Sequence, residues 1–325
     1  MISKEMESRI DKFIEENRQN IVNDIAKLVN IKSVSTHSDD PNSPFGEGCH
    51  KVLDKALEMC EAMGFKTRNY DYYAGSAVFG SGDKEIAILG HLDVVPEGEG
   101  WSHDPYDMIE KDGYIYGRGV ADDKGPTVVG LYALKCMKEL GIQPNYTFRL
   151  VMGCSEETGM GDLPHYLEAE KMPTFAFTPD ADFPVCIGEK GQLGVTIEIP
   201  VDSKVITNLV GGTVSNAVCA SATATLKGVT EADLGSYDKA VYSVEAVEGG
   251  IKLTAVGKTA HAAKPEGSIN ATKVLFELIA TLPQLSEAEK NAVKVVAEVP
   301  LFLHLLEVRN HDAHQLNDDR SGDVR

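Results

Sequence analysis

The chain has 325 residues, 42% hydrophobic and 25% charged, which is typical of a globular protein with two domains. Its formal net charge of −19 at pH 7 argues against nucleic acid or an anionic membrane as a partner, because both attract basic surfaces. The N-terminus has no signal-peptide pattern, no apolar run could span a bilayer, and the six cysteines form no C-x-x-C pair, so we expect a cytoplasmic protein with reduced thiols.

The first half of the chain alternates helical and strand patterns. Apolar residues recur at helical spacing from Met6 to Leu28, and a second helix is predicted from Gly48 to Met63. The runs AVFG and EIAILGH predict strands, the second apolar enough to be buried on both faces. A helix from Thr127 to Leu140, the strand YTFRLVMG, the short helix PHYLEAE and the strand TFAFTPD follow. This alternation predicts an α/β domain with a largely parallel sheet.

The pattern changes near Ile187. The segments GVTIEIP, ASATATLKG and YSVEAVEGGIKLTAVG show the period-two alternation of half-exposed strands, and the last should form a hairpin about Gly249-Gly250. Helices are predicted from Asn270 to Leu282 and from Ser286 to Val299. We therefore predict two domains, residues 1–186 and residues 187–325, the second of the α+β class.

Acidic and histidine side chains gather where strands of the first domain are predicted to end. The pairs are His91/Asp93, Asp122/Asp123, Glu156/Glu157 and Asp180/Asp182. One such pair is commonly a turn or a helix N-cap, but four pairs at the carboxyl edge of an α/β sheet would crowd negative charge that a cation relieves. One imidazole among carboxylates suits zinc, manganese or cobalt. Magnesium-dependent phosphoryl transfer is a weaker alternative, because the sequence contains no P-loop motif.

The segments GHLDVVP, GRGVADDKGP, CSEETG and FTPDADFP resemble, in order and spacing, the motifs of the aminoacylase/carboxypeptidase family of di-zinc metallopeptidases. The resemblance is strongest to the PepV-type branch of bacterial dipeptidases, and it runs from the first helix to beyond residue 270. It implies a zinc-peptidase-like catalytic domain with a mostly parallel central sheet and helices on both faces, plus an α+β lid domain. It also implies a metal-dependent dipeptidase that hydrolyses its substrate with a metal-bridging water and a glutamate general base.

The resemblance implies two divalent metal ions, expected to be Zn²⁺, with Mn²⁺ or Co²⁺ as alternatives. His91 and Asp180 would hold one ion, and Glu157 would hold the other. Asp122 would bridge the two ions, and the peptide bond between Asp122 and Asp123 would be cis.

Four further residues receive roles from the same resemblance. Glu156 would be the general base, and Asp93 would lie behind His91 and orient its imidazole. In the second domain, His261 in KTAHAAKPEGSINA matches the lid histidine that polarises the scissile carbonyl. Asn216 in GGTVSNAV matches a substrate-contacting asparagine of the lid, although the proline that usually follows it is absent.

The sequence departs from the family at its C-terminus. Family members return from the lid to the catalytic domain and supply a histidine that completes the second metal site, whereas this sequence ends within the lid. His304, His311 and His314 lie in the wrong domain for that role. We therefore expect a C-terminally truncated member, whose own activity is an open question.

Two alternatives to a dipeptidase remain. The chain could be an amidohydrolase acting on N-acyl amino acids, of the deacetylase or desuccinylase type, or a non-catalytic truncated remnant that binds metal. Expected partners are small peptide substrates, with neither nucleic acid nor membrane. The expected state is a monomer, with a dimer as the alternative.

Overall fold

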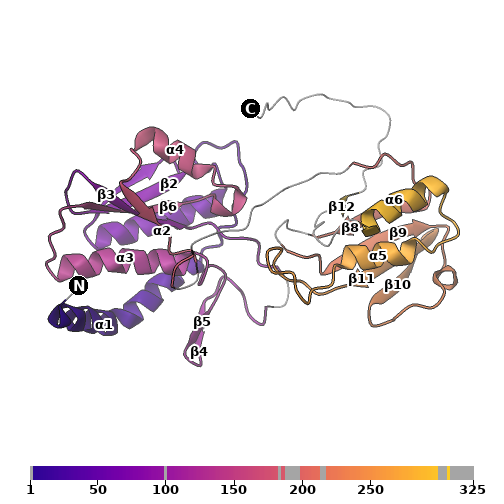
Figure 1. The fold of residues 1–325 in the computed structure, drawn as a ribbon, viewed down its shortest axis with the longest axis horizontal. Helices are drawn as coiled ribbons and strands as arrows, with labels where there is room; N and C mark the ends of the chain where they lie inside the picture. The colour runs from indigo at the N-terminus through magenta and orange to yellow at the C-terminus, as the bar shows by residue number, and fades with distance from the viewer. Residues whose placement is uncertain are drawn as a thin grey trace. The chain divides into compact units, whose positions relative to one another are not determined.

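The structure is a computed structural model, and it describes residues 3–98, 101–181, 184–186, 198–212, 217–298 and 306–307. The chain divides into two compact units, Met1–Ile187 and Gly188–Arg325, which are described separately (Figure 1). Within the described residues, no helix combines the length and apolarity that crossing a membrane requires.

The first unit is built on a five-stranded mixed sheet in the order β1-β2-β6-β3-β7. Its strands are β1 (Lys66–Tyr70), β2 (Ala74–Phe79), β3 (Glu85–His91), β6 (Thr147–Gly153) and β7 (Phe175–Phe177). Strands β6, β3 and β7 are parallel, which confirms the predicted parallel centre, while β1 and β2 form an antiparallel hairpin whose second strand pairs with β6. Strand β1 was missed because its sequence, KTRNY, lies at the sheet edge and has no apolar alternation.

Helices cover both faces of this sheet, as predicted (Figure 1). They are α1 (Lys4–Val29), α2 (Glu47–Ala62), α3 (Lys124–Glu139) and α4 (Asp162–Ala169). Leu150 of β6 packs in the core shared with α1, α2 and α3, whereas Val151 packs in a smaller cluster with Tyr166 of α4. Successive residues of a strand point to opposite faces, so β6 contributes to both cores. A small hairpin, β4 (Ile109–Lys111) and β5 (Tyr114–Tyr116), lies outside the main sheet.

Lys124 joins the start of α3 to the end of α1. The helix begins at Lys124 rather than at the predicted Thr127, and Pro126 occupies the first turn, where no backbone N–H is needed. The Lys124 side chain is wholly buried, and its Nζ donates to the carbonyl oxygens of Leu28 (3.0 Å) and Ile31 (2.8 Å). Burial lowers the pKa of Lys124 to about 7. The loop that precedes α3 is thereby anchored to α1.

The second unit contains an antiparallel sheet in the order β10-β11-β9-β8-β12. Its strands are β8 (Ile206–Gly211), β9 (Ser221–Lys227), β10 (Tyr242–Val247), β11 (Gly250–Val256) and β12 (Leu306–Glu307). The hairpin predicted about Gly249-Gly250 is confirmed, because Val247 pairs with Gly250 and Gly249 takes the positive φ that a tight turn requires. Most of the predicted strand GVTIEIP lies outside the described residues.

The two helices predicted in this unit are confirmed as α5 (Ala271–Ile279) and α6 (Glu287–Glu298). Helix α5 begins after Asn270, whose side-chain oxygen accepts the N–H of Thr272 at 2.9 Å, as an N-cap residue does. Apolar residues of both helices pack with β8, β9 and β11 in one core. The second unit therefore has the α+β composition predicted for it.

Glu289 ties the start of α6 to the segment before β8. Its carboxylate accepts hydrogen bonds from the N–H and hydroxyl of Ser286, from the hydroxyl of Ser203, and from the N–H groups of Lys204 and Val205. Burial raises the pKa of Glu289, but these hydrogen bonds outweigh it and lower the pKa to about 2. Ser286 and Glu289 form a capping box, because the N–H of Glu289 donates to the Ser286 hydroxyl at 3.3 Å while the N–H of Ser286 donates to the Glu289 carboxylate at 2.7 Å.

Candidate metal centre

The side chains predicted to hold metal meet at the carboxyl edge of the first sheet. His91 is the last residue of β3, Glu156 and Glu157 open the 3₁₀ turn η1 (Glu156–Thr158) after β6, and Asp180 follows β7. Because these three strands are parallel, their carboxyl ends lie at the same edge. Asp122 comes from the loop before α3, and its peptide bond to the next residue is cis, as the family resemblance implied.

His91 lies at the middle of the cluster. Its Nε2 is 3.0 Å from Oδ1 of Asp122, 3.5 Å from Oδ2 of Asp180 and 4.0 Å from Oε2 of Glu156. Two groups of possible ligand atoms share this imidazole, one with Asp122 and Glu157 and one with Glu156 and Asp180, and the atoms of each group lie within 4.8 Å of one another. Both glutamates are therefore close enough to the histidine to ligate an ion with it.

Asp93 connects the histidine to the glutamates. Its backbone oxygen is 3.0 Å from Nδ1 of His91, and since a carbonyl only accepts, Nδ1 donates and Nε2 of the neutral ring is left to act as a ligand. The Asp93 carboxylate is wholly buried and accepts the N–H of Glu156 at Oδ1 and that of Glu157 at Oδ2, both at 3.1 Å. The Ser35 hydroxyl donates to Oδ2 at 2.9 Å. Sequence reasoning predicted the contact with His91 but missed the contacts with the glutamate backbone and with Ser35.

Asp123 makes contacts different from those of Asp122, its neighbour in the sequence. It is wholly buried, and its Oδ2 accepts the N–H of His91 at 3.1 Å and the hydroxyl of Thr127 at 3.0 Å. Burial raises the pKa of Asp123 to about 7. Gly90 leaves room for these contacts, because a Cβ there would lie 2.1 Å from Oγ1 of Thr127. Asp123 thus joins the end of β3 to the start of α3, and among the described residues the possible ligand groups include Asp122 instead.

The residues predicted in the second unit are described only in part. His261 is exposed and forms an isolated antiparallel bridge with Ala217, and its Nδ1 accepts the N–H of Ala263 at 3.1 Å. Asn216 lies outside the described residues, as do Asp182 of the first unit and three further histidines, His304, His311 and His314. The roles of His261 and Asn216 remain predictions.

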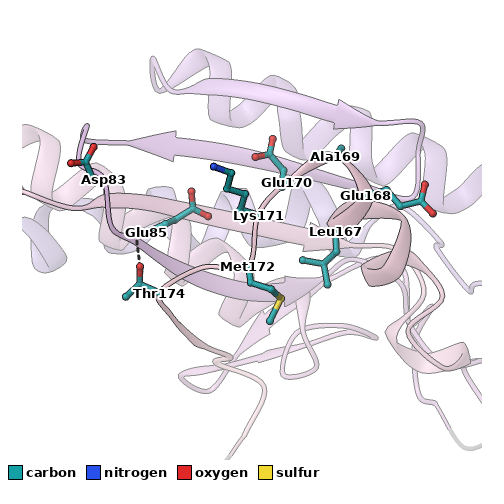
Figure 2. A pocket seen from close by; sticks show the side chains of 9 residues that line it. All are labelled: Asp83, Glu85, Leu167, Glu168, Ala169, Glu170, Lys171, Met172 and Thr174. Carbon is teal, nitrogen blue, oxygen red and sulfur yellow. Dashed lines mark hydrogen bonds between the residues drawn. The ribbon is translucent and has the colours of Figure 1, made fainter.

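A pocket of about 570 Å³ lies at the other end of β3 (Figure 2). Glu85, which lines it, begins the strand that His91 ends. Arg149 binds Glu85 through two nitrogens at 3.0 and 2.9 Å and lies 3.3 Å from Glu170, a second lining residue. Because Glu85 and His91 are at opposite ends of β3, the pocket is separate from the cluster around His91.

Comparison with known proteins decides the family. Residues 87–299 match the peptidase family M20/M25/M40. This chain belongs to that family. The chain is 35% identical over 295 residues to YtjP of Bacillus subtilis, which is named as a dipeptidase, and the alignment covers 86% of this chain and 64% of YtjP. It is 32% identical over 307 residues to the Beta-Ala-Xaa dipeptidase of Lactobacillus delbrueckii subsp. lactis, covering 90% of this chain and 65% of that protein. The chain therefore spans just under two thirds of the length of these relatives.

The crowded carboxylates of the cluster favour a bound cation, which agrees with the metal dependence of M20 peptidases. Burial, and then the neighbouring charge of Asp122, raise the pKa of Glu157 to about 7, and burial also raises the pKa of Glu156. Burial lowers the pKa of His91, but hydrogen bonds to Asp122 and Asp180 raise it by more. Carboxylates crowded in this way gain from a cation between them, and an imidazole with carboxylates is a ligand set that Zn²⁺ and Mn²⁺ accept. His91, Asp122, Asp180 and the two glutamates could therefore hold divalent ions.

Proposed function

We propose that this chain carries the metal-binding part and the lid of an M20 dipeptidase that hydrolyses the peptide bond of small peptides. The observation that carries the proposal is the convergence of His91, Asp122, Glu156, Glu157 and Asp180 at one edge of the sheet. The names of the relatives support the substrate class, since the Lactobacillus protein is a Beta-Ala-Xaa dipeptidase and YtjP is named as a dipeptidase.

Four of these residues are proposed as ligands of two ions. His91 and Asp180 would hold one ion, Glu157 the other, and Asp122 both, and the ions would be Zn²⁺, with Mn²⁺ or Co²⁺ as alternatives. When bound, such ions would supply Lewis-acid polarisation of the peptide carbonyl and would make water acidic enough to attack at neutral pH.

The remaining steps belong to side chains of this chain. Glu156 takes a proton from the attacking water as the water oxygen bonds to the carbonyl carbon, and it delivers that proton to the amine as the C–N bond breaks. A raised pKa suits this role, because a base is most effective when its pKa lies near the working pH. Asp93 keeps Nδ1 of His91 occupied, so that Nε2 faces the carboxylates.

We also propose a cytoplasmic location. The cysteines Cys49, Cys60, Cys136, Cys154 and Cys219 are buried thiols, and burial raises the pKa of Cys49 and Cys60 to about 12. Thiols of this kind are unreactive and need no oxidising compartment. The net charge of −19 supports small peptides, rather than nucleic acid or membranes, as partners.

A hydrolysis panel with metal analysis tests the proposed function. A version of the chain extended to the length of its relatives should hydrolyse dipeptides faster than N-acetyl or N-succinyl amino acids, and a chelator should abolish the hydrolysis until Zn²⁺ or Mn²⁺ is restored. Faster cleavage of the N-acyl amino acids would identify an amidohydrolase instead. A metal content of about one ion per chain with no turnover of either class would support the non-catalytic remnant, whereas about two ions support a complete site.

His261 is proposed to polarise the scissile carbonyl. His261→Ala should lower kcat by about 10²- to 10³-fold and change KM far less, because the contact strengthens as negative charge develops on the carbonyl oxygen. Steady-state kinetics measure both constants. His165→Ala is the control, since that histidine pairs with Asp71 at 3.1 Å and stacks on Tyr73, away from the cluster. An unchanged kcat in His261→Ala would mean that His261 is an ordinary exposed residue.

A further inference from the structure

Asp162, the first residue of α4, turns its side chain back toward the end of β6. Its Oδ2 accepts the N–H groups of Cys154 (2.7 Å) and Ser155 (3.0 Å), and its Oδ1 accepts the N–H of Leu163 (2.9 Å). The residue is only 2% exposed, so these hydrogen bonds offset the cost of burying a carboxylate. Gly153 provides the space, because a Cβ there would lie 2.3 Å from Oδ2 of Asp162.

The two N–H groups that follow are also held by a buried carboxylate. Those of Glu156 and Glu157 donate to Asp93, so the consecutive backbone N–H groups of residues 154–157 all point at two buried aspartates. Asp93 accepts the N–H groups of the two glutamates, and Asp162 accepts those of the two residues just before them. Each residue has two soft backbone dihedrals, so freeing residues 154 and 155 would let the following residues swing together.

We propose that Asp162 is a positioning residue for Glu156 and Glu157, setting the direction in which both side chains leave the end of β6. The proposal rests on the proposed function, because it concerns the side chains that would serve as base and ligand there. A displacement of about 1 Å at such a site costs on the order of 10²-fold in rate. If Asp162 only stabilised the first turn of α4, as any acidic residue near a helix N-terminus can, its loss would lower stability and leave the glutamates in place.

Asp162→Asn separates these two roles. The asparagine keeps the size of the side chain but offers one oxygen to three N–H donors and turns an NH₂ group toward at least one of them. Calorimetric titration of the metal-free 325-residue chain with Zn²⁺ should show affinity reduced by about 10- to 100-fold. Amide hydrogen exchange at Glu156 and Glu157 should become about tenfold faster or more, although neither N–H is bonded to Asp162.

Asp24→Asn is the matched control within the same unit. Asp24 is 7% exposed, and its carboxylate accepts from Nζ of Lys27 (2.7 Å) and the hydroxyl of Tyr132 (2.8 Å), which joins α1 to α3. Its loss should lower the thermal midpoint of unfolding. Zn²⁺ affinity and exchange at Glu156 and Glu157 should stay at the wild-type values.

The outcomes distinguish the positioning role from the proposed function. Wild-type Zn²⁺ affinity and wild-type exchange at Glu156 and Glu157 in Asp162→Asn would overturn the positioning role. If the wild-type chain binds none of Zn²⁺, Mn²⁺ and Co²⁺, the proposed function is wrong, and exchange alone decides: faster exchange at the glutamates upholds the positioning role, and unchanged exchange rejects it.

The wild-type protein gives a second measurement that does not depend on whether the variant folds. If Asp162 and Asp93 hold one cooperative unit, the amides of residues 154–157 should share one protection factor. Protection at residues 154 and 155 that differs from that at residues 156 and 157 by more than about tenfold would reject the positioning role.

Discussion

In a version of the chain extended to the length of its relatives, Glu156→Gln is expected to lower kcat by about 10²- to 10⁴-fold while metal content stays near the wild-type value. A glutamine amide has nearly the same shape as the carboxylate but cannot take a proton from the attacking water. The backbone N–H of Glu156 donates to Asp93 in either case, so the main chain should not move. Dipeptide hydrolysis and metal analysis of the same purified sample measure the two effects.

Glu157→Gln is the matched variant, one residue away on the same turn. Its N–H also donates to Asp93, so any difference between the two variants reflects the side chains. Glu157 groups with His91 and Asp122, and as a ligand it should lose metal when neutralised. Glu156 also groups with His91 and Asp180, which makes the opposite assignment physically possible. Loss of metal in Glu156→Gln with retention in Glu157→Gln would reverse the two roles, and metal analysis alone detects this.

The local sequence pattern was enough to locate the histidine, the glutamates and Asp180. The prediction that Asp122 follows a strand of the main sheet was wrong, because it lies in the loop before α3. The apolar run EIAILGH predicted a buried strand, and β3 ends at His91 as that run does. YTFRLVMG predicted β6, so the position of the Glu156–Glu157 pair at a strand end followed from the sequence. Parallel strands bring their carboxyl ends together, so knowledge of side-chain packing was unnecessary to expect these residues at one edge.

Contacts between side chains and a distant backbone could not be predicted in this way. Asp93 lies 63 residues before Glu156, whose N–H it accepts, and no periodicity in the sequence encodes that pairing. Asp162 belongs to a short helix whose apolar pattern says nothing about where its first carboxylate turns. Lys124 would be expected at the surface from its type, yet it is buried because two carbonyl oxygens near the end of α1 accept from it. Such contacts depend on the tertiary fold, which brings residues far apart in sequence within hydrogen-bonding distance.

His91→Ala should abolish both the binding of one ion and all peptidase activity. The imidazole is central to the cluster, since it belongs to both possible ligand groups and is 3% exposed. Its removal leaves only carboxylates, whose mutual repulsion disfavours their charged forms at neutral pH. Metal analysis after dialysis should show at least one ion fewer per chain than in the wild type. Full metal content in His91→Ala would mean that the carboxylates bind the ions without the histidine.

Asp93 variants test whether a residue that contacts the ligand His91, without binding metal itself, affects metal affinity less than His91 does. Asp93→Ala should keep metal but reduce its affinity by about 10- to 100-fold, because the imidazole loses the carboxylate at 3.3 Å and keeps the backbone oxygen at 3.0 Å. The same change leaves the N–H groups of Glu156 and Glu157 without their acceptor, so it should also destabilise the fold. Asp93→Asn retains one oxygen and should lie between wild type and Asp93→Ala in both affinity and thermal midpoint. If Asp93→Ala removes metal as completely as His91→Ala, then Asp93 is itself a ligand and its contacts with the backbone are secondary.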